Sequence, residues 1–511
     1  MGSSLPNTES LSFAHISYTF IAIALLYLGY ELLSHPLNRY PGPFFARLTN
    51  GYGAFFAVRR SLHLATFKNH LKYGPVVRQG PNKLVFNSVT ALRDIYHSEN
   101  ITKPVTYLSN QTTPGSFNTW NALDNGLHSR KRKLSGPAVN DRSMRAFEPT
   151  MAKQVDIFIQ QLALCQGTPI DMKMRCNYLA MDVVGLLSFG YPLHSQTDSK
   201  NRFLADEMAR GNRRLNIYMQ IPFIPRHRLQ IPINLIWYKS REVVFRLIES
   251  MIKSRMKADR HATHDLYSFV VDALMTEEGK DLRINDLWME AILFIVAGGD
   301  TTSTAISATF FYLARHRECY KRLSEEIRST FQSGKDIGGS KLASCQYLRA
   351  CIDESLRMSP PLPGILWREQ CPDKGNNPLI IDGHVVPKGT YVGEYFPDPF
   401  TFKPERWLEP QGQEGAPGSR KAMHSAFVPF SIGSRGCAGK AMAYLEMNLT
   451  IAKTLWYFDF EPAPGKLGNV GLSDRGEFRL YDIYLSTHDG PWLVFNPRST
   501  LTEDFPELAS K

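Results

Sequence analysis

Phe430-Ser-Ile-Gly-Ser-Arg-Gly-Cys-Ala-Gly439 places one cysteine at the end of a glycine-rich loop, directly before a strongly periodic apolar pattern. Gly433 and Gly436 allow the backbone to turn tightly against a flat ligand. A helix that starts at Ala438 would point its first N–H groups at the sulfur of Cys437 and favour the thiolate. The stretch therefore predicts an axial thiolate ligand for a metal.

The same run has the form Phe-x-x-Gly-x-Arg-x-Cys-x-Gly and resembles the cysteine signature of the cytochrome P450 family. A buried cysteine after a chance glycine loop is the alternative, but it requires five positions to coincide at fixed spacing. The resemblance runs through essentially the whole chain after its N-terminal segment. It implies a mainly α fold with small β-sheets (α+β), a haem-thiolate monooxygenase of fungal microsomal type, haem b (iron protoporphyrin IX) as cofactor and Cys437 as the metal ligand.

Composition is consistent with one large globular domain. The chain has 511 residues, of which 43% are hydrophobic and 21% charged, so it can form an extensive core. The net charge of +11 is dispersed and no nucleic-acid motif accompanies it, which favours an anionic membrane or an acidic protein partner over nucleic acid. Seven widely spaced cysteines without a Cys-x-x-Cys pair indicate neither a zinc site nor a disulfide framework, and reduced thiols place the domain in the cytosol.

The N-terminal segment predicts a membrane anchor. Leu11 to Tyr30 carries no formal charge and is about one bilayer crossing long as a helix. A cleaved signal peptide is the alternative, but no basic residue precedes the segment and no small-residue cleavage site follows it. Basic residues beyond the anchor predict a cytosolic domain. We expect an anchor at 1–33, a stiff proline-rich hinge at 34–46 and the catalytic domain at 47–511, held in the endoplasmic reticulum membrane by a single span.

Asp286 to Arg317 contains no proline and predicts a long, largely buried helix with Ala297-Gly-Gly-Asp-Thr-Thr302 at its centre. Each mid-helix glycine costs about 1 kcal/mol relative to alanine, so either a neighbour approaches closely or the helix is locally opened. Tight packing alone would explain the glycines, but not a buried acid beside an alcohol. The resemblance implies that Asp300 and Thr301 are catalytic, Thr301 as a hydrogen-bond donor where dioxygen binds and Asp300 as a relay for solvent protons.

The resemblance also implies a scaffold and a set of haem contacts. Glu354 and Arg357 share one helix face and would form a buried triad with Arg406 of Phe402-Lys-Pro-Glu-Arg-Trp407, although such pairs are usually solvated. Guanidinium groups suit haem propionates. The remaining residues of the helix face around 130–133 should be solvated and could meet an acidic redox partner: Arg130, Lys131 and Lys133. The cofactor-binding candidates are His128, Arg132, Ala297, Arg368, Phe430, Arg435 and Cys437.

The order of patterns is helical to about residue 360, then short strands near 365 to 395, the cysteine loop, and a terminal hairpin around Asp489-Gly490. One departure from the family stands after Gly393, where Glu394-Tyr-Phe-Pro-Asp-Pro follows at once although the family has a strand and a short helix. Either this form is a splicing or gene-model variant, or the sheet is repaired locally. A non-catalytic or impaired haem-binding protein is therefore one alternative function.

The expected cavity wall is mostly apolar and predicts a lipophilic substrate from secondary metabolism. We expect NADPH-cytochrome P450 reductase as the electron donor, with cytochrome b5 as an additional one. A haem-thiolate isomerase or dehydratase is a second alternative, which the Asp300-Thr301 pair disfavours because such enzymes need no proton relay. The wall residues should come from Tyr107 to Trp120, Ile217 to Pro225, Leu293, Phe294, Ala297, Pro363 to Leu366 and Tyr484 to Ser486.

Overall fold

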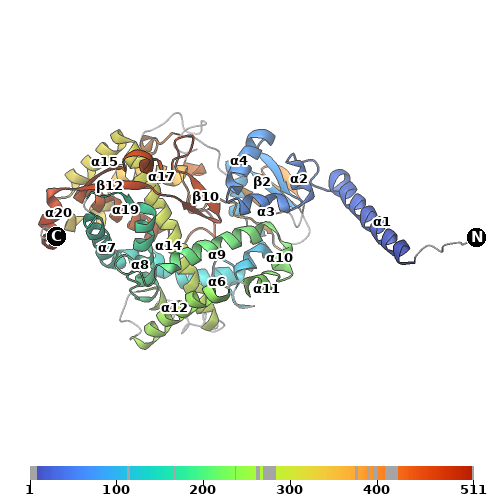
Figure 1. Cartoon of the computed structure of the whole chain (residues 1–511), viewed down its shortest axis with the longest axis horizontal. Helices are drawn as coiled ribbons and strands as arrows, with labels where there is room; N and C mark the ends of the chain where they lie inside the picture. Colours follow the sequence, from blue (N-terminus) through green and yellow to red (C-terminus); the bar gives the residue numbers. More distant parts are fainter. Residues whose placement is uncertain are drawn as a thin grey trace, which may run out of the picture.

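The computed structural model is dominated by helices, with small sheets at its periphery (Figure 1). It describes residues 8–111, 115–165, 167–235, 238–259, 265–268, 284–373, 378–387, 391–394, 401–408 and 424–508. The mainly α architecture with small sheets that the sequence predicted is confirmed.

The helices fall into two groups along the chain. Those before residue 260 are α1 (Thr8–Gly29), α2 (Phe44–Leu48), α3 (Gly51–Val58), α4 (Leu62–Tyr73), α5 (Val89–Tyr96), α6 (Asn125–Ser135), α7 (Asp141–Ala163), α8 (Met172–Phe189), α9 (Phe203–Gln220), α10 (Phe223–Arg226), α11 (Gln230–Leu235) and α12 (Tyr238–Lys257). Those after residue 280 are α14 (Ile284–Arg315), α15 (Arg317–Thr330), α16 (Gly339–Ala343), α17 (Gln346–Met358), α19 (Lys440–Tyr457) and α20 (Ser499–Asp504).

The strands form separate small sheets. One sheet has the order β1-β2-β8, another has the order β4-β12-β9, and the pairs β3-β5, β6-β7 and β10-β11 form two-stranded sheets. The strands are β1 (Val76–Gly80), β2 (Lys83–Phe86), β3 (Ile101–Thr102), β4 (Ile170–Asp171), β5 (Glu369–Gln370), β6 (Leu379–Ile381), β7 (His384–Val386), β8 (Tyr391–Glu394), β9 (Phe458–Pro462), β10 (Leu480–Ile483), β11 (Leu485–His488) and β12 (Trp492–Pro497).

Helix α14 runs through the middle of the domain and packs against α8 and α19 (Figure 1). Its glycines lie at the contact with α8. A Cβ atom on Gly298 would lie 2.8 Å from Cγ2 of Val184, and one on Gly299 would lie 2.5 Å from Cε of Met181. Close approach of α8 therefore explains both glycines, and the helix continues through them without a break.

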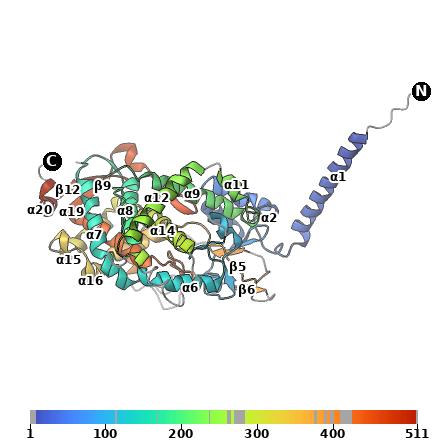
Figure 2. The ribbon, with the colours of Figure 1, turned by 90° about the horizontal axis from the view of Figure 1, so that it is seen from below.

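Helix α1 projects away from the rest of the chain, at the end opposite the C-terminus (Figures 1 and 2). By length and composition the segment His15–Ser34 could cross a membrane, with a mean hydropathy of 1.6. The hinge that follows is fixed to the domain. Its Leu37 and Tyr40 are buried, and the Tyr40 hydroxyl donates to the carbonyl oxygen of Val385 at 3.0 Å.

The buried triad expected around Glu354 is confirmed. Its carboxylate accepts from Nε of Arg357 and from Nε of Arg406, both at 2.9 Å, and from the indole N–H of Trp407 at 3.0 Å. Glu354 is fully buried, so its charge is balanced by these donors rather than by water. The triad joins α17 to the 3₁₀ turn Pro404–Trp407, which precedes the cysteine loop.

The sheet continues across the junction after Gly393, where we expected it to be incomplete. Tyr391–Glu394 forms β8, which pairs in parallel with β2 through Lys83↔Tyr391 and Phe86↔Glu394. The sheet is therefore extended across the position of the shortened segment, as the alternative of local repair required. Residues 395–400, where the family has its short helix, lie outside the described residues.

The terminal hairpin around Asp489-Gly490 is also not formed. This turn joins β11 to β12, but β12 pairs with β4 and β9, whereas β11 pairs with β10. The hairpin turns instead at Tyr484, which has a φ of 84° and lies between the paired residues Ile483 and Leu485.

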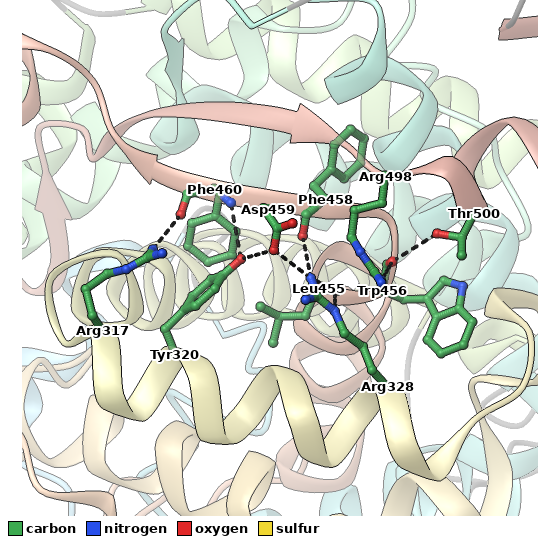
Figure 3. Close-up of polar contacts among 10 residues, drawn as sticks. All are labelled: Arg317, Tyr320, Arg328, Leu455, Trp456, Phe458, Asp459, Phe460, Arg498 and Thr500. Atoms are coloured by element: carbon green, nitrogen blue, oxygen red, sulfur yellow. Dashed lines mark hydrogen bonds and ion pairs between the residues drawn. The ribbon is translucent and has the colours of Figure 1, made fainter.

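The C-terminal end of α19 is held by cations from other elements (Figure 3). Arg328 of α15 donates to the carbonyl oxygen of Leu455 at 2.9 Å, and Arg498 donates to that of Trp456 at 2.7 Å. Arg328 also pairs with Asp459 at 2.7 Å. These contacts satisfy carbonyl groups that a helix end leaves without partners, and they fix the far end of the helix that follows the cysteine loop.

Candidate functional site

The loop before α19 holds Cys437 at the wall of an internal cavity. The N–H of Cys437 donates to the carbonyl oxygen of Phe430 at 2.8 Å, which closes the loop. Gly433 has a φ of 73°, and any side chain there would clash with the carbonyl oxygen of Tyr96. The sulfur of Cys437 opens on the cavity. Burial raises the pKa of its thiol, while a hydrogen bond from the backbone of Gly439 and the positive charge of Arg132 act in the opposite direction.

The cavity has a volume of about 1370 Å³ and lies between the cysteine loop and α14. Apolar residues of α14 and of the β10-β11 hairpin form much of its wall, including Leu293, Phe294 and Leu485. The expected contribution of Ile217 to Pro225 is wrong, because α9 reaches the cavity earlier in the helix, through Asn212 and Leu215. Of the cofactor-binding candidates, all of His128, Arg132, Ala297, Arg368, Phe430, Arg435 and Cys437 line this one cavity.

Four cations from separate segments surround the same space: Lys103, Arg132, Arg368 and Arg435. Arg435 donates to the carbonyl oxygen of Ala122 at 2.6 Å, and Arg368 donates to that of Trp367 at 3.0 Å. Within the described residues, none of the four forms an ion pair with a carboxylate.

The electrostatic effect of these cations is clearest at His128. Burial and the neighbouring charges of Arg435 and Lys103 lower the pKa of its imidazole to about 3, so this histidine is neutral. A cavity that holds several buried cations without a described counter-charge favours a dianionic ligand. The site therefore has the properties required to bind a flat dicarboxylate beside a thiolate ligand, and the residues present fit haem b.

Lys103 is a cavity residue that the sequence analysis did not identify. Its Nζ donates to the carbonyl oxygen of Trp120 at 2.5 Å and lies 4.8 Å from the ring centroid of Tyr107. Burial, together with the charges of Arg368 and Arg435, lowers the pKa of Lys103 well below its usual value. No motif surrounds it, so only its position in the folded cavity identifies it.

Asp300 and Thr301 lie on different sides of α14. Thr301 lines the cavity, and its hydroxyl donates to the carbonyl oxygen of Ala297 at 2.6 Å. The carboxyl group of Asp300 turns instead toward α8 and α9, where it accepts from Nδ2 of Asn212 at 3.0 Å and from Nδ2 of Asn177 at 3.4 Å. Burial raises the pKa of Asp300 to about 7, against these two hydrogen bonds. Asp300 can therefore exchange a proton near neutral pH.

The expectation that Lys131 is solvated is wrong. Its side chain is buried, and its Nζ lies 3.6 Å from Oε1 of Glu290 on α14. Arg130 and Lys133 on the same helix are exposed, as expected. Glu290 also accepts from the backbone N–H of Thr119 at 2.7 Å. A cation that looked like part of a solvated face thus belongs to a buried contact between α6, the loop before it and α14.

Comparison with known proteins supports the same family resemblance along most of the chain. The family model described as Cytochrome P450 matches residues 41–470. The chain is 32% identical over 496 residues to the Cytochrome P450 monooxygenase atnE of Emericella nidulans, which covers 92% of this chain and 94% of the relative. It is also 32% identical to the Cytochrome P450 monooxygenases poxM of Penicillium oxalicum and apf7 of Gibberella fujikuroi, each over 94% of this chain and 94% and 97% of the relatives.

Proposed function

The chain belongs to the cytochrome P450 family and is a haem b monooxygenase, and on this premise we propose that it inserts one oxygen atom of O2 into a lipophilic small molecule of fungal secondary metabolism. The fungal origin of the relatives supports the pathway class. The apolar wall formed by residues such as Leu293 and Phe294 supports a lipophilic substrate.

One observation carries the proposal: the sulfur of Cys437 opens on the cavity that the unpaired cations surround. Cys437 would bind the haem iron through its sulfur, and Phe430 and Ala297 would contact the bound group. Bound haem supplies the activation of dioxygen for insertion into C–H or C=C bonds, with electron density from the thiolate. The propionates would be held by Arg132, Arg368 and Arg435, with His128 and Lys103 nearby.

The protein's own part in the reaction is to position the substrate and to supply protons. The Thr301 hydroxyl now donates to Ala297, so a rotation about its side chain is needed before it can donate into the cavity. The carboxyl group of Asp300 faces α8 and α9, so it would also have to turn before it could give up a proton toward that site, and it would take one back from solvent.

The end of the domain from which α1 extends has features that favour membrane attachment. Helices α2, α3 and α10 lie at this end (Figure 1). They carry the exposed apolar side chains of Phe45, Phe55 and Phe223. We propose a single span in the endoplasmic reticulum membrane and a cytosolic domain. Electrons would come from NADPH-cytochrome P450 reductase, with cytochrome b5 as an additional donor, and the exposed Arg130 and Lys133 would contact the acidic partner.

The ferrous-CO spectrum of membranes that contain the full chain tests the proposal. The wild type should show the thiolate Soret band near about 450 nm, and Cys437→Ser should lose it because the hydroxyl is a much poorer donor. The matched control is Cys165→Ser, since Cys165 is half-buried and does not line the cavity. A Cys437→Ser protein that kept the band, or a control that lost it, would refute the assignment of the ligand.

A further inference from the structure

The partners of Asp300 are neutral amides from two different helices. Asn177 on α8 and Asn212 on α9 each donate from Nδ2 to one carboxyl oxygen. Asp300 forms no ion pair with a described residue. The described charged group whose field reaches Asp300 is Lys173 on α8, which pairs with Asp489 at 3.8 Å.

A neutral partner has a different effect on an acid from that of a cation. A lysine or arginine can only donate, so it stabilises the carboxylate alone. A side-chain amide has donors and an acceptor on one planar group, and a rotation of 180° about its last torsion angle exchanges them. Such an amide can donate to a carboxylate or accept from the hydroxyl of a carboxylic acid.

Asn177 has the acceptor that this exchange requires. Its Oδ1 atom is buried and has no hydrogen-bond partner among the described residues. A buried carbonyl oxygen without a partner is energetically unfavourable, because it has lost its hydrogen bonds to water. Rotation of the amide would remove that cost when Asp300 is protonated, because Oδ1 would then accept the hydroxyl of the acid. The Oδ1 atom of Asn212 is not among the buried unpartnered atoms, so Asn212 has no corresponding reason to rotate.

We propose that Asn177 is a positioning residue whose amide rotates with the protonation of Asp300, donating to the carboxylate and accepting from the acid, while Asn212 remains a fixed donor. The inference rests on the proposed role of Asp300 in proton delivery. It explains how an acid buried among helices serves a cycle of proton release and uptake: one proton leaves the carboxyl group, one returns from solvent, and a hydrogen bond to Asn177 exists in both states.

The experiment follows the infrared carbonyl band of protonated Asp300 in the haem-loaded, substrate-free full chain, as a function of pH. The band is identified as the one that Asp300→Asn removes. In Asn177→Leu the acid loses its acceptor and the carboxylate loses a donor. The band should therefore shift to higher wavenumber, while the titration midpoint changes little because the two losses oppose each other.

Asn212→Leu is the matched control, since it removes a donor to Oδ2 of Asp300 in both protonation states. Its midpoint should rise by about one pH unit, which is a tenfold change in proton affinity, because a donor stabilises the carboxylate more than the acid. Its band should also shift to higher wavenumber, because the carbonyl of the acid loses its donor, so the titration midpoint is what distinguishes the two leucine variants. Asn177→Thr should restore the wild-type band because a hydroxyl group both donates and accepts. If Asn177→Thr restores the band, the effect of Asn177→Leu comes from the lost hydrogen bond and not from loss of folding.

An Asn177→Leu protein whose titration midpoint rises like that of Asn212→Leu would overturn the proposal, and so would an Asn177→Leu protein with an unchanged band. The proposed function is tested separately. If Asp300→Asn left the rate of NADPH-dependent turnover unchanged, the relay would fail even where the infrared shift showed that the amide rotates.

Discussion

The contact of Glu290 with the loop before α6 should control the opening of the cavity wall. Thr119 lines the cavity and donates to Glu290 from its backbone N–H at 2.7 Å and from its hydroxyl at 2.9 Å. Burial raises the pKa of Glu290 to about 7, so the measurement is made at about pH 9, where Glu290 is ionised. A hydrogen bond to such a charged acceptor contributes about 1.5 to 3 kcal/mol. In Glu290→Met the N–H of Thr119 loses this acceptor. Local opening of the loop should then increase about 10- to 150-fold, since about 1.4 kcal/mol corresponds to a factor of ten.

Hydrogen–deuterium exchange of the peptide that contains Thr119 measures this opening in the full chain. Glu290→Gln retains a neutral acceptor and should fall between the wild type and Glu290→Met. Lys131→Met removes the cation at 3.6 Å but leaves the bonds from Thr119, so it should affect exchange less than Glu290→Met. Glu249→Gln is the surface control, because its pair with Lys253 is exposed and should not affect this loop. Equal exchange in the wild type and in Glu290→Met would refute the reasoning.

Three further predictions concern stability, coupling and cofactor loading. Burial raises the pKa of Glu446 to about 8, so the folded state keeps a proton that the unfolded state releases above pH 4.5. The free energy of unfolding should therefore decline between about pH 5 and pH 8. Glu446→Gln should remove that decline, measured as the thermal midpoint at each pH. Thr301→Ala should keep the ferrous-CO band but divert reducing equivalents to hydrogen peroxide, measured per NADPH oxidised. Because β8 already pairs with β2, a family-like segment inserted between Gly393 and Glu394 should not raise the haem-to-protein ratio; a clear gain would show that the shortened form is impaired.

The parts of the fold that the sequence predicted are those that local pattern determines. The run from Phe430 to Gly439, the long apolar stretch around Ala297 and the Glu354-Arg357 spacing each combine a backbone requirement with a side-chain requirement at short range. Structure and prediction agree there, to within two residues at the ends of α14. Helix periodicity and the spacing of a motif can be recognised without knowledge of tertiary partners.

The errors arise where a residue's partner lies far along the chain. The turn signal at Asp489-Gly490 specifies a reversal of direction, but it does not specify that the two flanking strands pair with each other. Lys131 was expected in solvent because an unpaired buried ammonium is costly. Its partner Glu290 stands more than 150 residues later, so no local pattern could reveal the pair.

The cation cluster shows why the cofactor belongs to the core of this domain rather than to its surface. Lys103, Arg132, Arg368 and Arg435 come from four separate segments, and each must leave water when the chain folds. Desolvation and mutual repulsion both oppose that convergence: burial first, and then the charges of Arg368 and Arg435, lower the pKa of Lys103 well below its usual value. A ligand with two carboxylates removes the repulsion and uses the desolvated guanidinium groups as donors. Binding of haem and docking of these segments should therefore be coupled, because a ligand that binds only the folded state shifts the folding equilibrium toward it.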